Sequence, residues 1–188
     1  MEAQVKAVNR LALKEWSVVV RVLHEGSGIL TFLEDYIPAD REFFLLPTYE
    51  RQREEALKPS AGMSYRHELR PPLAGHVYIR DYAEVADSFE VQSFDAVKAV
   101  DREHPFTLPE MKRRLESAPA GLVAVALRTY RLPRPRRITE RQKYEDGDRF
   151  QALPEEIATD GAAPAVSAEV FGHRLAVVRR ALGDAADG

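Results

Sequence analysis

The sequence of 188 residues contains no cysteine. This absence excludes disulfide scaffolds, cysteine-ligated zinc, iron–sulfur centres and thiol nucleophiles, and it makes the cytoplasm the expected compartment. Long apolar runs are also missing. Because Lys6, Arg10 and Lys14 interrupt the N-terminal segment, we expect neither a secretory signal nor a membrane span, and no membrane partner.

Sequence signatures of several enzyme classes are missing as well. The chain has no glycine-rich phosphate loop, no Gly-x-Ser-x-Gly turn and no dinucleotide-binding fingerprint, which argues against kinases, serine hydrolases of that type and Rossmann dehydrogenases. None of the five histidines lies at the spacing of a zinc site. We therefore predict that the protein uses no cofactor.

The charges that are present nearly balance. There are 27 Lys and Arg residues against 30 Asp and Glu residues, a formal net charge of −3, and 45% of the residues are hydrophobic. A chain of this length and composition can bury the core of a single domain. A net charge close to zero attracts no polyanion from a distance, so any contact with nucleic acid must come from a local cluster of cations.

The first half of the chain alternates between helix and strand signals. Apolar residues at helical spacing and the closing Gly26 favour one helix over Leu11–Gly26 rather than a strand through Val18–Val20. A short polar helix is expected over Tyr49–Leu57, with Thr48 as its N-cap. The remaining expectations are strands over Gly28–Glu34 and Glu42–Leu46 and a loop over Pro59–Pro72.

The second half contains clearer signals. The segments His76–Tyr82 and Phe89–Phe94 predict a hairpin or two neighbouring strands, and Gly121–Leu132 predicts a central strand. Thr107 followed by Pro109 is typical of a helix start. Residues 167–183 predict an amphipathic helix, whose apolar face carries Phe171, Leu175, Val178 and Leu182.

Together these elements indicate an α+β fold. We expect a small mixed sheet that is flanked by helices and followed by a C-terminal helix. The sequence does not decide whether this sheet curves into a barrel-like form. By composition we divide the chain into a core domain with a basic strand extension over residues 1–143, an acidic linker over 144–166, and the terminal helix over 167–183.

Three sequence elements resemble a known bacterial family. They are Leu13-Lys14-Glu15-Trp16, the segment from Phe43 to Gln52 with its Pro-Thr-Tyr-x-x-Gln pattern, and Leu127–Pro133, and together they resemble the domain-of-unknown-function family 1802. Two departures stand out, because acidic Glu34 and Asp35 replace an expected basic, glycine-rich stretch and Arg51 replaces an expected histidine. This resemblance implies relatives but no activity. The order of elements also resembles the small barrels of the pseudouridine-synthase-and-archaeosine type, which implies RNA binding.

The strongest functional signal is a basic stretch. Residues 128–143 carry seven cations against one acid, and clustered guanidinium groups with an interleaved tyrosine suit phosphate binding and base stacking. The leading hypothesis is therefore a non-enzymatic nucleic-acid-binding or accessory module, for RNA or DNA, whose contact residues are Arg128, Tyr130, Arg131, Arg134, Arg136 and Arg137. In the competing interpretation, acids that follow in residues 145–156 neutralise these arginines within the chain.

Other residues support alternative functions. Thr48, Tyr49 and Gln52 could line a ligand pocket where a strand meets a helix, although Thr48 can equally be a cap and Tyr49 a core residue. The terminal helix or the acidic linker could dock a protein partner. Asp81, Asp87 and Glu90 suggest a metal-dependent, nuclease-like hydrolase only if their carboxylates converge.

Overall fold

The computed structural model describes residues 11–34, 37, 41–72, 75–139 and 148–183. Seven strands and five α-helices lie within these residues, together with three short 3₁₀ turns, and no helix among them is long and apolar enough to span a membrane. In chain order the elements are β1 (Leu11–Trp16), α1 (Ser17–Glu25), β2 (Leu30–Leu33), β3 (Glu42–Thr48), η1 (Glu54–Ala56), α2 (Pro59–Ser64), η2 (Arg66–Leu69), β4 (His76–Val91), α3 (Phe94–Ala99), η3 (Asp101–Glu103), α4 (Leu108–Ser117), β5 (Leu122–Thr139), β6 (Phe150–Ala152), β7 (Ala163–Pro164) and α6 (Ala168–Gly183).

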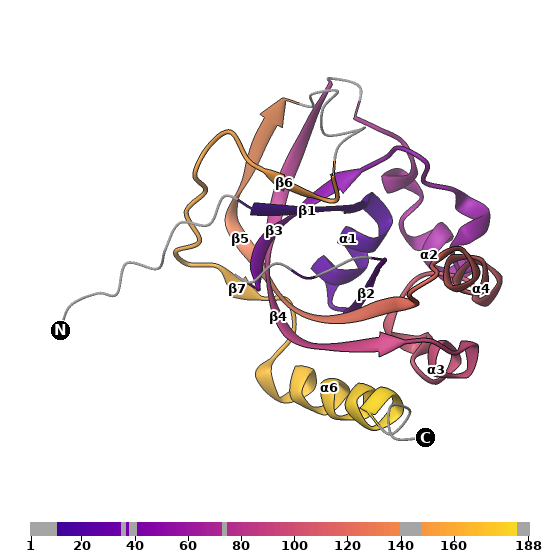
Figure 1. Ribbon diagram of the computed structural model, residues 1–188. Coiled ribbons are helices and arrows are strands. Elements are labelled where there is room, and N and C mark those ends of the chain that lie inside the picture. Colours follow the sequence, from indigo (N-terminus) through magenta and orange to yellow (C-terminus); the bar gives the residue numbers. More distant parts are fainter. Residues whose placement is uncertain (1–10, 35–36, 38–40, 73–74, 140–147, 184–188) are drawn as a thin grey trace.

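The strands form one mixed sheet, which confirms the α+β class. Their order is β2-β5-β4-β3-β1-β6, with β7 paired to β5. The β1–β3 pair is parallel and the other pairs are antiparallel. In the part of the chain that the structure describes, β2 and β6 are free edges, so the sheet is open and not a closed barrel. Figure 1 shows that it curves around α1.

The N-terminal segment differs from the single predicted helix. Residues Leu11–Trp16 form β1, and the helix begins only at Ser17. β1 pairs with β3 and β6, and Ala12 and Leu13 are fully buried on opposite faces because a hydrophobic cluster covers each face of the sheet. Pairing with distant strands therefore overrides the local helix preference. Gly26 ends α1 in the left-handed conformation, with φ of 68°, as predicted.

Two predictions between residues 48 and 72 are also wrong. Thr48 is the last residue of β3, and the only helical turn between Thr48 and Leu57, a stretch that the structure describes throughout, is the three-residue η1. Arg51 has a positive φ of 56°, which breaks a right-handed helix at this point. The expected loop over Pro59–Pro72 instead contains α2 and η2. Pro59 takes the first position of α2, where its missing N–H costs no hydrogen bond.

The hairpin or pair of neighbouring strands expected over residues 76–94 is mostly one long strand, β4. β4 continues through Ala86 and Asp87 with a register shift, since β5 is long enough to pair along its whole length. Phe94 lies in α3 and not in a strand, and Ser93 caps that helix by accepting a hydrogen bond from the Ala96 N–H at 3.2 Å. The residues between the two predicted segments therefore contain a bulge and not a turn.

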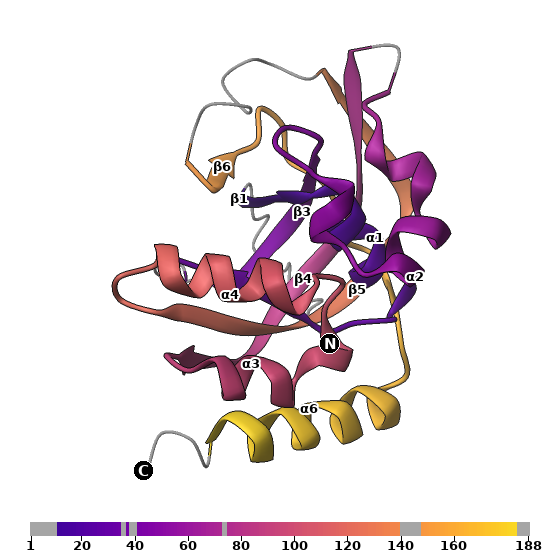
Figure 2. The ribbon, with the colours of Figure 1, turned by 90° about the vertical axis from the view of Figure 1, so that its right-hand side faces the viewer.

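Several local predictions are confirmed. Thr107 accepts a hydrogen bond from the Glu110 N–H at the start of α4. The strand beginning near Gly121 is β5, although it runs on to Thr139. The predicted apolar face of α6 is buried, and Figure 2 shows α6 beside α3.

Hydrophobic residues pack on both faces of the sheet. The larger cluster contains α1, α6 and one face of β1 and β3, and the smaller cluster contains Phe44, Ile79 and Tyr82 on the opposite face. Leu153 and Ile157, from the segment expected to be an acidic linker, cover this second face. That segment also supplies β6 and β7, so its described part is integral to the sheet.

Candidate functional site

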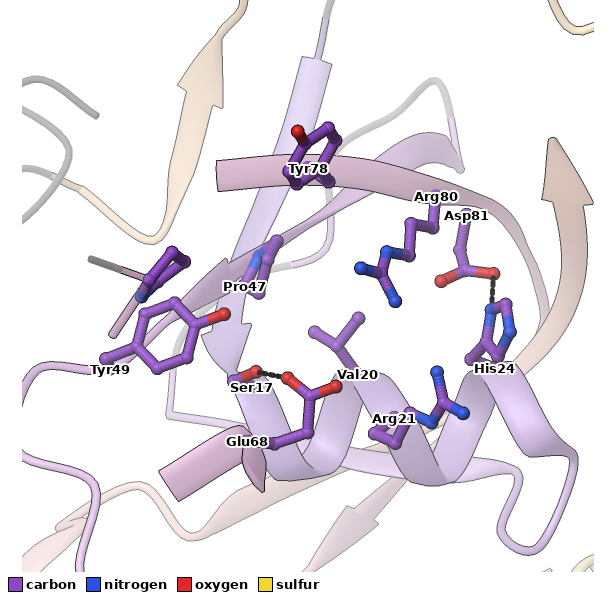
Figure 3. A pocket seen from close by; sticks show the side chains of 11 residues that line it. Ser17, Val20, Arg21, His24, Pro47, Tyr49, Glu68, Tyr78, Arg80 and Asp81 are labelled. Atoms are coloured by element: carbon purple, nitrogen blue, oxygen red, sulfur yellow. Dashed lines mark hydrogen bonds and ion pairs between the residues drawn. The ribbon is translucent and has the colours of Figure 1, made fainter. Parts of the chain in front are cut away.

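A pocket of about 60 Å³ lies between α1, the end of β3 and the start of β4 (Figure 3). Helix α1 presents four of its residues to this pocket, Ser17, Val20, Arg21 and His24. Their spacing of three or four residues places them on one face of the helix. The opposite walls consist of Pro47, Tyr49, Glu68, Pro72, Tyr78, Arg80 and Asp81.

Gln52 holds the N-terminal end of α1. Its side-chain oxygen accepts a hydrogen bond from the Val18 N–H at 3.0 Å, and its side-chain nitrogen donates to the Glu68 carbonyl at 2.8 Å. The Ser17 hydroxyl donates to the Glu68 carboxylate at 2.6 Å. Gln52, a predicted ligand residue, therefore satisfies a free helix N–H and joins two walls of the pocket.

A buried carboxylate precedes the same end of the helix. Glu15 is 3% exposed, accepts a hydrogen bond from the Thr31 hydroxyl at 2.6 Å, and pairs with Arg149 at 2.5 Å. Burial alone would raise the pKa of Glu15, but the Arg149 and Arg114 guanidiniums and the hydrogen bonds outweigh it and lower the pKa. The negative charge also suits the positive end of the helix dipole.

Two arginines hold the C-terminal end of α1. Arg131 of β5 donates to the His24 carbonyl at 2.8 Å. Arg174 of α6 donates to the Gly26 carbonyl at 2.5 Å and to the Ser27 carbonyl at 3.1 Å. These guanidiniums satisfy carbonyls that have no partner inside the helix, and their charge suits its negative end. Arg131, predicted to bind phosphate, thus stabilises the fold.

An irregularity in strand pairing shapes the opposite wall. Ile79 pairs with Arg136 and Asp81 pairs with Arg131. Arg80 alone in β4 therefore lies opposite the four residues 132–135 of β5. In regular strands neighbouring residues point to opposite faces. Here both Arg80 and Asp81 line the pocket, which fits the way a bulge redirects a side chain.

Arg80 extends over the pocket from β4 toward α1 (Figure 3). Its guanidinium carbon lies 5.8 Å from the centre of the Tyr78 ring, and Tyr78 is 37% exposed. Among the described residues, Arg80 has no carboxylate partner. An exposed aromatic ring and an uncompensated cation therefore lie side by side at the pocket.

Asp81 and His24 form a pair deeper in the site. The Nδ1 atom of His24 lies 2.7 Å from Oδ1 of Asp81 (Figure 3). Asp81 is 1% exposed, and its second oxygen, Oδ2, has no hydrogen-bond partner among the residues that the structure places. The His24 side chain keeps 21% exposure. A buried carboxylate thus orients an imidazole that remains accessible.

The six predicted nucleic-acid contacts have different environments. Arg128 lies over the Tyr130 and Phe171 rings, and the Tyr130 hydroxyl donates to Glu84 at 3.0 Å. The Arg136 guanidinium pairs with Glu155, so part of the expected neutralisation within the chain occurs. Arg134 and Arg137 are exposed and have no ion pair with any described residue.

Arg137 belongs to the pocket side of the sheet. It is paired directly with Tyr78 across the β4–β5 ladder. Residues directly opposite each other in a ladder point to the same face. The structure therefore brings Arg137 together with Tyr78, whereas the predicted pocket residue Thr48 ends β3 and only Tyr49 of the original trio lines the pocket.

The three acids of the hydrolase alternative do not converge. Asp81 binds His24, Asp87 pairs with Arg179 at 2.6 Å, and Glu90 is exposed. No group of three or more potential metal ligands occurs among the described residues. Arg141 and Lys143 of the basic stretch lie outside them.

The sequence carried weak signals for the residues that were missed. Arg21 and His24 interrupt a valine-rich helix at the spacing of one face, and this pattern marks a polar stripe. Nothing local indicated that His24 meets Asp81, because 57 residues separate them. The side-chain direction of Arg80 depends on the register between β4 and β5, which the sequence alone does not specify.

Comparison with protein families gives a match over residues 12–176 to the model described as Domain of unknown function (DUF1802). The chain belongs to the DUF1802 family. Pro47 and Tyr49, from the Pro-Thr-Tyr segment that carried the resemblance, line the pocket of this DUF1802 protein.

Other comparisons add a structural likeness only. No curated protein matches significantly. The crystal structure of a mutant of the ZmASCH protein from Zymomonas mobilis is similar, with a TM-score of 0.47 and 13% sequence identity. The likeness covers 88% of the DUF1802 chain and 93% of the other chain.

Proposed function

We propose that this DUF1802 protein binds single-stranded nucleic acid across the pocket between α1 and β4. Tyr78 stacks on an unpaired base, while Arg80 and Arg137 neutralise adjacent phosphates. The supporting observation is that these three side chains belong to one face at the start of β4 and the end of β5. Arg134, three residues before Arg137 in β5, is also exposed.

The charges around the pocket favour an anionic ligand. Glu68 is engaged by the Ser17 hydroxyl, and Asp81 by His24. Arg80 and Arg137 have no such partner within the described chain. A phosphate can therefore bind them without first breaking an internal ion pair, and guanidinium groups are well suited to bind it through two hydrogen bonds.

The aromatic group favours a single strand over a duplex. Base stacking on a tyrosine requires a base that has left its own stack, and it contributes about 1–3 kcal/mol per base. Tyr78 exposes its ring beside Arg80, so a stacked base would also contact a cation. Tyr130, the tyrosine predicted for this role, is bound to Glu84 and packs near Tyr82.

Binding to labelled single-stranded RNA and DNA oligonucleotides tests the proposal. Fluorescence anisotropy at several salt concentrations should give affinity that falls as salt rises. Arg137→Glu should weaken binding about tenfold or more and reduce the log–log salt slope by about 0.7 or more, the value for one phosphate contact with a single strand. Tyr78→Ala should weaken binding about tenfold.

Arg180→Glu is the matched control, because Arg180 is exposed on α6, away from the pocket. It makes the same charge change and should leave the affinity close to that of the native protein. Absence of binding at low salt would overturn the proposal. So would equal losses in Arg137→Glu and Arg180→Glu, since that result would indicate a response to net charge alone.

A further inference from the structure

We propose that His24 and Asp81 act as a general-base pair that cleaves RNA bound in the pocket. This inference rests on the proposed function, because it requires an RNA strand to lie over Arg80 and Tyr78. It goes further by assigning a reaction, internal transesterification of a phosphodiester, and a role to each side chain.

The bond between the two residues selects the reactive nitrogen. Nδ1 of His24 lies 2.7 Å from Asp81 Oδ1, and because a carboxylate can only accept a hydrogen bond, we assign the proton of this bond to Nδ1. The lone pair of the neutral ring then lies on Nε2, for which no partner exists among the described residues. Because the side chain lines the pocket and is partly exposed, Nε2 can accept a proton from a bound ligand.

Asp81 has the environment of an orienting carboxylate. It is 1% exposed, and one of its oxygens has no partner in the described structure. A buried negative charge is costly without a compensating charge. The imidazolium that forms when His24 accepts a proton supplies that charge, so Asp81 stabilises the protonated ring as well as its orientation.

Ser17 is the only serine among the described residues that line the pocket, and it is not placed to attack beside this pair. Ser17 shares the pocket face of α1 but is seven residues from His24, which is about 10 Å along a helix. Its hydroxyl also donates to Glu68. The attacking group must therefore come from the ligand or from water, and the 2′-hydroxyl next to each RNA phosphate is already placed for attack.

Two arginines line the pocket, and one of them is available for the phosphate. Arg80 and Arg21 line the same pocket as His24, from β4 and α1 respectively. Arg21 is paired with Glu25 at 2.5 Å, whereas Arg80 has no carboxylate partner in the described chain. Arg80 is thus the group that stabilises the negative charge developing on the phosphate oxygens in the transition state.

The reaction balances without an added reactant. Nε2 of His24 takes the proton of the 2′-hydroxyl, the 2′-oxygen forms a bond to phosphorus, and the bond from phosphorus to the 5′-oxygen breaks. The departing 5′-oxygen takes a proton from water, and the imidazolium returns its proton to the resulting hydroxide. The products are a 2′,3′-cyclic phosphate and a 5′-hydroxyl end.

The test uses the full chain, a labelled single-stranded RNA and its 2′-deoxy analogue, in the presence of EDTA. The native protein should cleave the RNA to products ending in a 2′,3′-cyclic phosphate and should bind the deoxy analogue without cleaving it. His24→Gln should lower the cleavage rate about a hundredfold or more. Its affinity for the deoxy analogue should change less than about twofold.

Two further variants separate catalysis from folding. His173→Gln, on the exposed side of α6, should cleave at the native rate. Asp81→Asn should lower kcat with little change in KM, because Asp81 acts through His24 and does not touch the RNA. A variant that failed to fold would lose binding to the deoxy analogue as well.

The outcomes distinguish this inference from the proposed function. Binding of both oligonucleotides without cleavage overturns the inference and leaves the binding function intact. Absence of binding overturns both. Cleavage that persists in His24→Gln, or that EDTA abolishes, also overturns the assignment of His24 as the base.

Discussion

Glu110 offers a quantitative test of the electrostatics of the fold. This residue of α4 is 5% exposed, and its carboxylate accepts hydrogen bonds from Arg53 at 2.7 Å, from Arg113 at 2.8 and 2.9 Å, and from Arg114 at 2.9 Å. Burial by itself would raise the pKa of Glu110. The Arg113 and Arg114 guanidiniums outweigh it and lower the pKa from 4.5 to about 2.

The sign and size of the effect on stability follow from linkage. The folded state stabilises the ionised form of Glu110 more than the unfolded chain does. This stabilisation is present above pH 4.5 and is lost as the pH falls toward 2. A pKa of about 2 in the folded state against 4.5 in the unfolded chain adds about 3 kcal/mol to the free energy of unfolding at pH 7. At pH 3 roughly 1 kcal/mol remains.

Urea unfolding at pH 7 and pH 3 measures this contribution. Glu110→Gln should lower the free energy of unfolding at pH 7 by about 3 kcal/mol, and its difference from the native protein should shrink to roughly 1 kcal/mol at pH 3. Glu116→Gln is the control on the same helix. Glu116 is 67% exposed, and its Oε1 atom lies 3.8 Å from Lys112 Nζ, so its ion pair is weak. It should cost less than about 0.5 kcal/mol.

Two results would refute this reasoning. One is an equal loss of stability in Glu110→Gln and Glu116→Gln at pH 7. The other is a difference between Glu110→Gln and the native protein that stays constant from pH 7 to pH 3, because a constant difference would mean that packing, and not charge, explains the loss.

Two substitutions test how the C-terminal end of α1 is held. Gly26→Ala should lower the free energy of unfolding by about 2 kcal/mol or more, because φ is 68° and a Cβ would collide with Val166. The double variant Gly26→Ala/Val166→Ala should regain only the part of this stability that the collision removed. Arg174→Ala removes hydrogen bonds to two carbonyls and an ion pair with a carboxylate, and should cost about 2–3 kcal/mol. Arg180→Ala, on the exposed side of the same helix, should cost less than about 0.5 kcal/mol. Thermal unfolding of the four variants would contradict this account if Arg174→Ala and Arg180→Ala behaved alike.

The sequence predicted best those elements that local chemistry defines. The Thr107 cap, the Gly26 helix end and the apolar face of α6 each depend on residues within a few positions of one another. The helix predicted from Leu11 failed because β1 pairs with β3 and β6, which are far away in the chain. The apolar residues of a strand buried on both faces do not alternate, so its pattern can be mistaken for one side of a helix.

The site was harder to predict than the fold, for a related reason. Arg134 and Arg137 were identified from composition, and both are exposed without an ion pair in the described structure. Composition could not distinguish them from Arg131, which binds a helix carbonyl, because that difference depends on which element each side chain meets. The pairing of His24 with Asp81 likewise exists only after α1 has packed against β4.

The unequal count of residues between β4 and β5 has a consequence for how the protein can vary. Two strands that span the same interval with one residue and with four have different contour lengths, so the ribbon must bend toward its shorter side. Pro133 and Pro135 lie in the longer path, where they need not donate ladder hydrogen bonds. The bend of the pocket wall that carries Arg80 and Asp81 therefore depends on chain length as well as on side chains. An insertion or deletion between Leu132 and Pro135 would therefore change this bend without replacing any residue that lines the pocket.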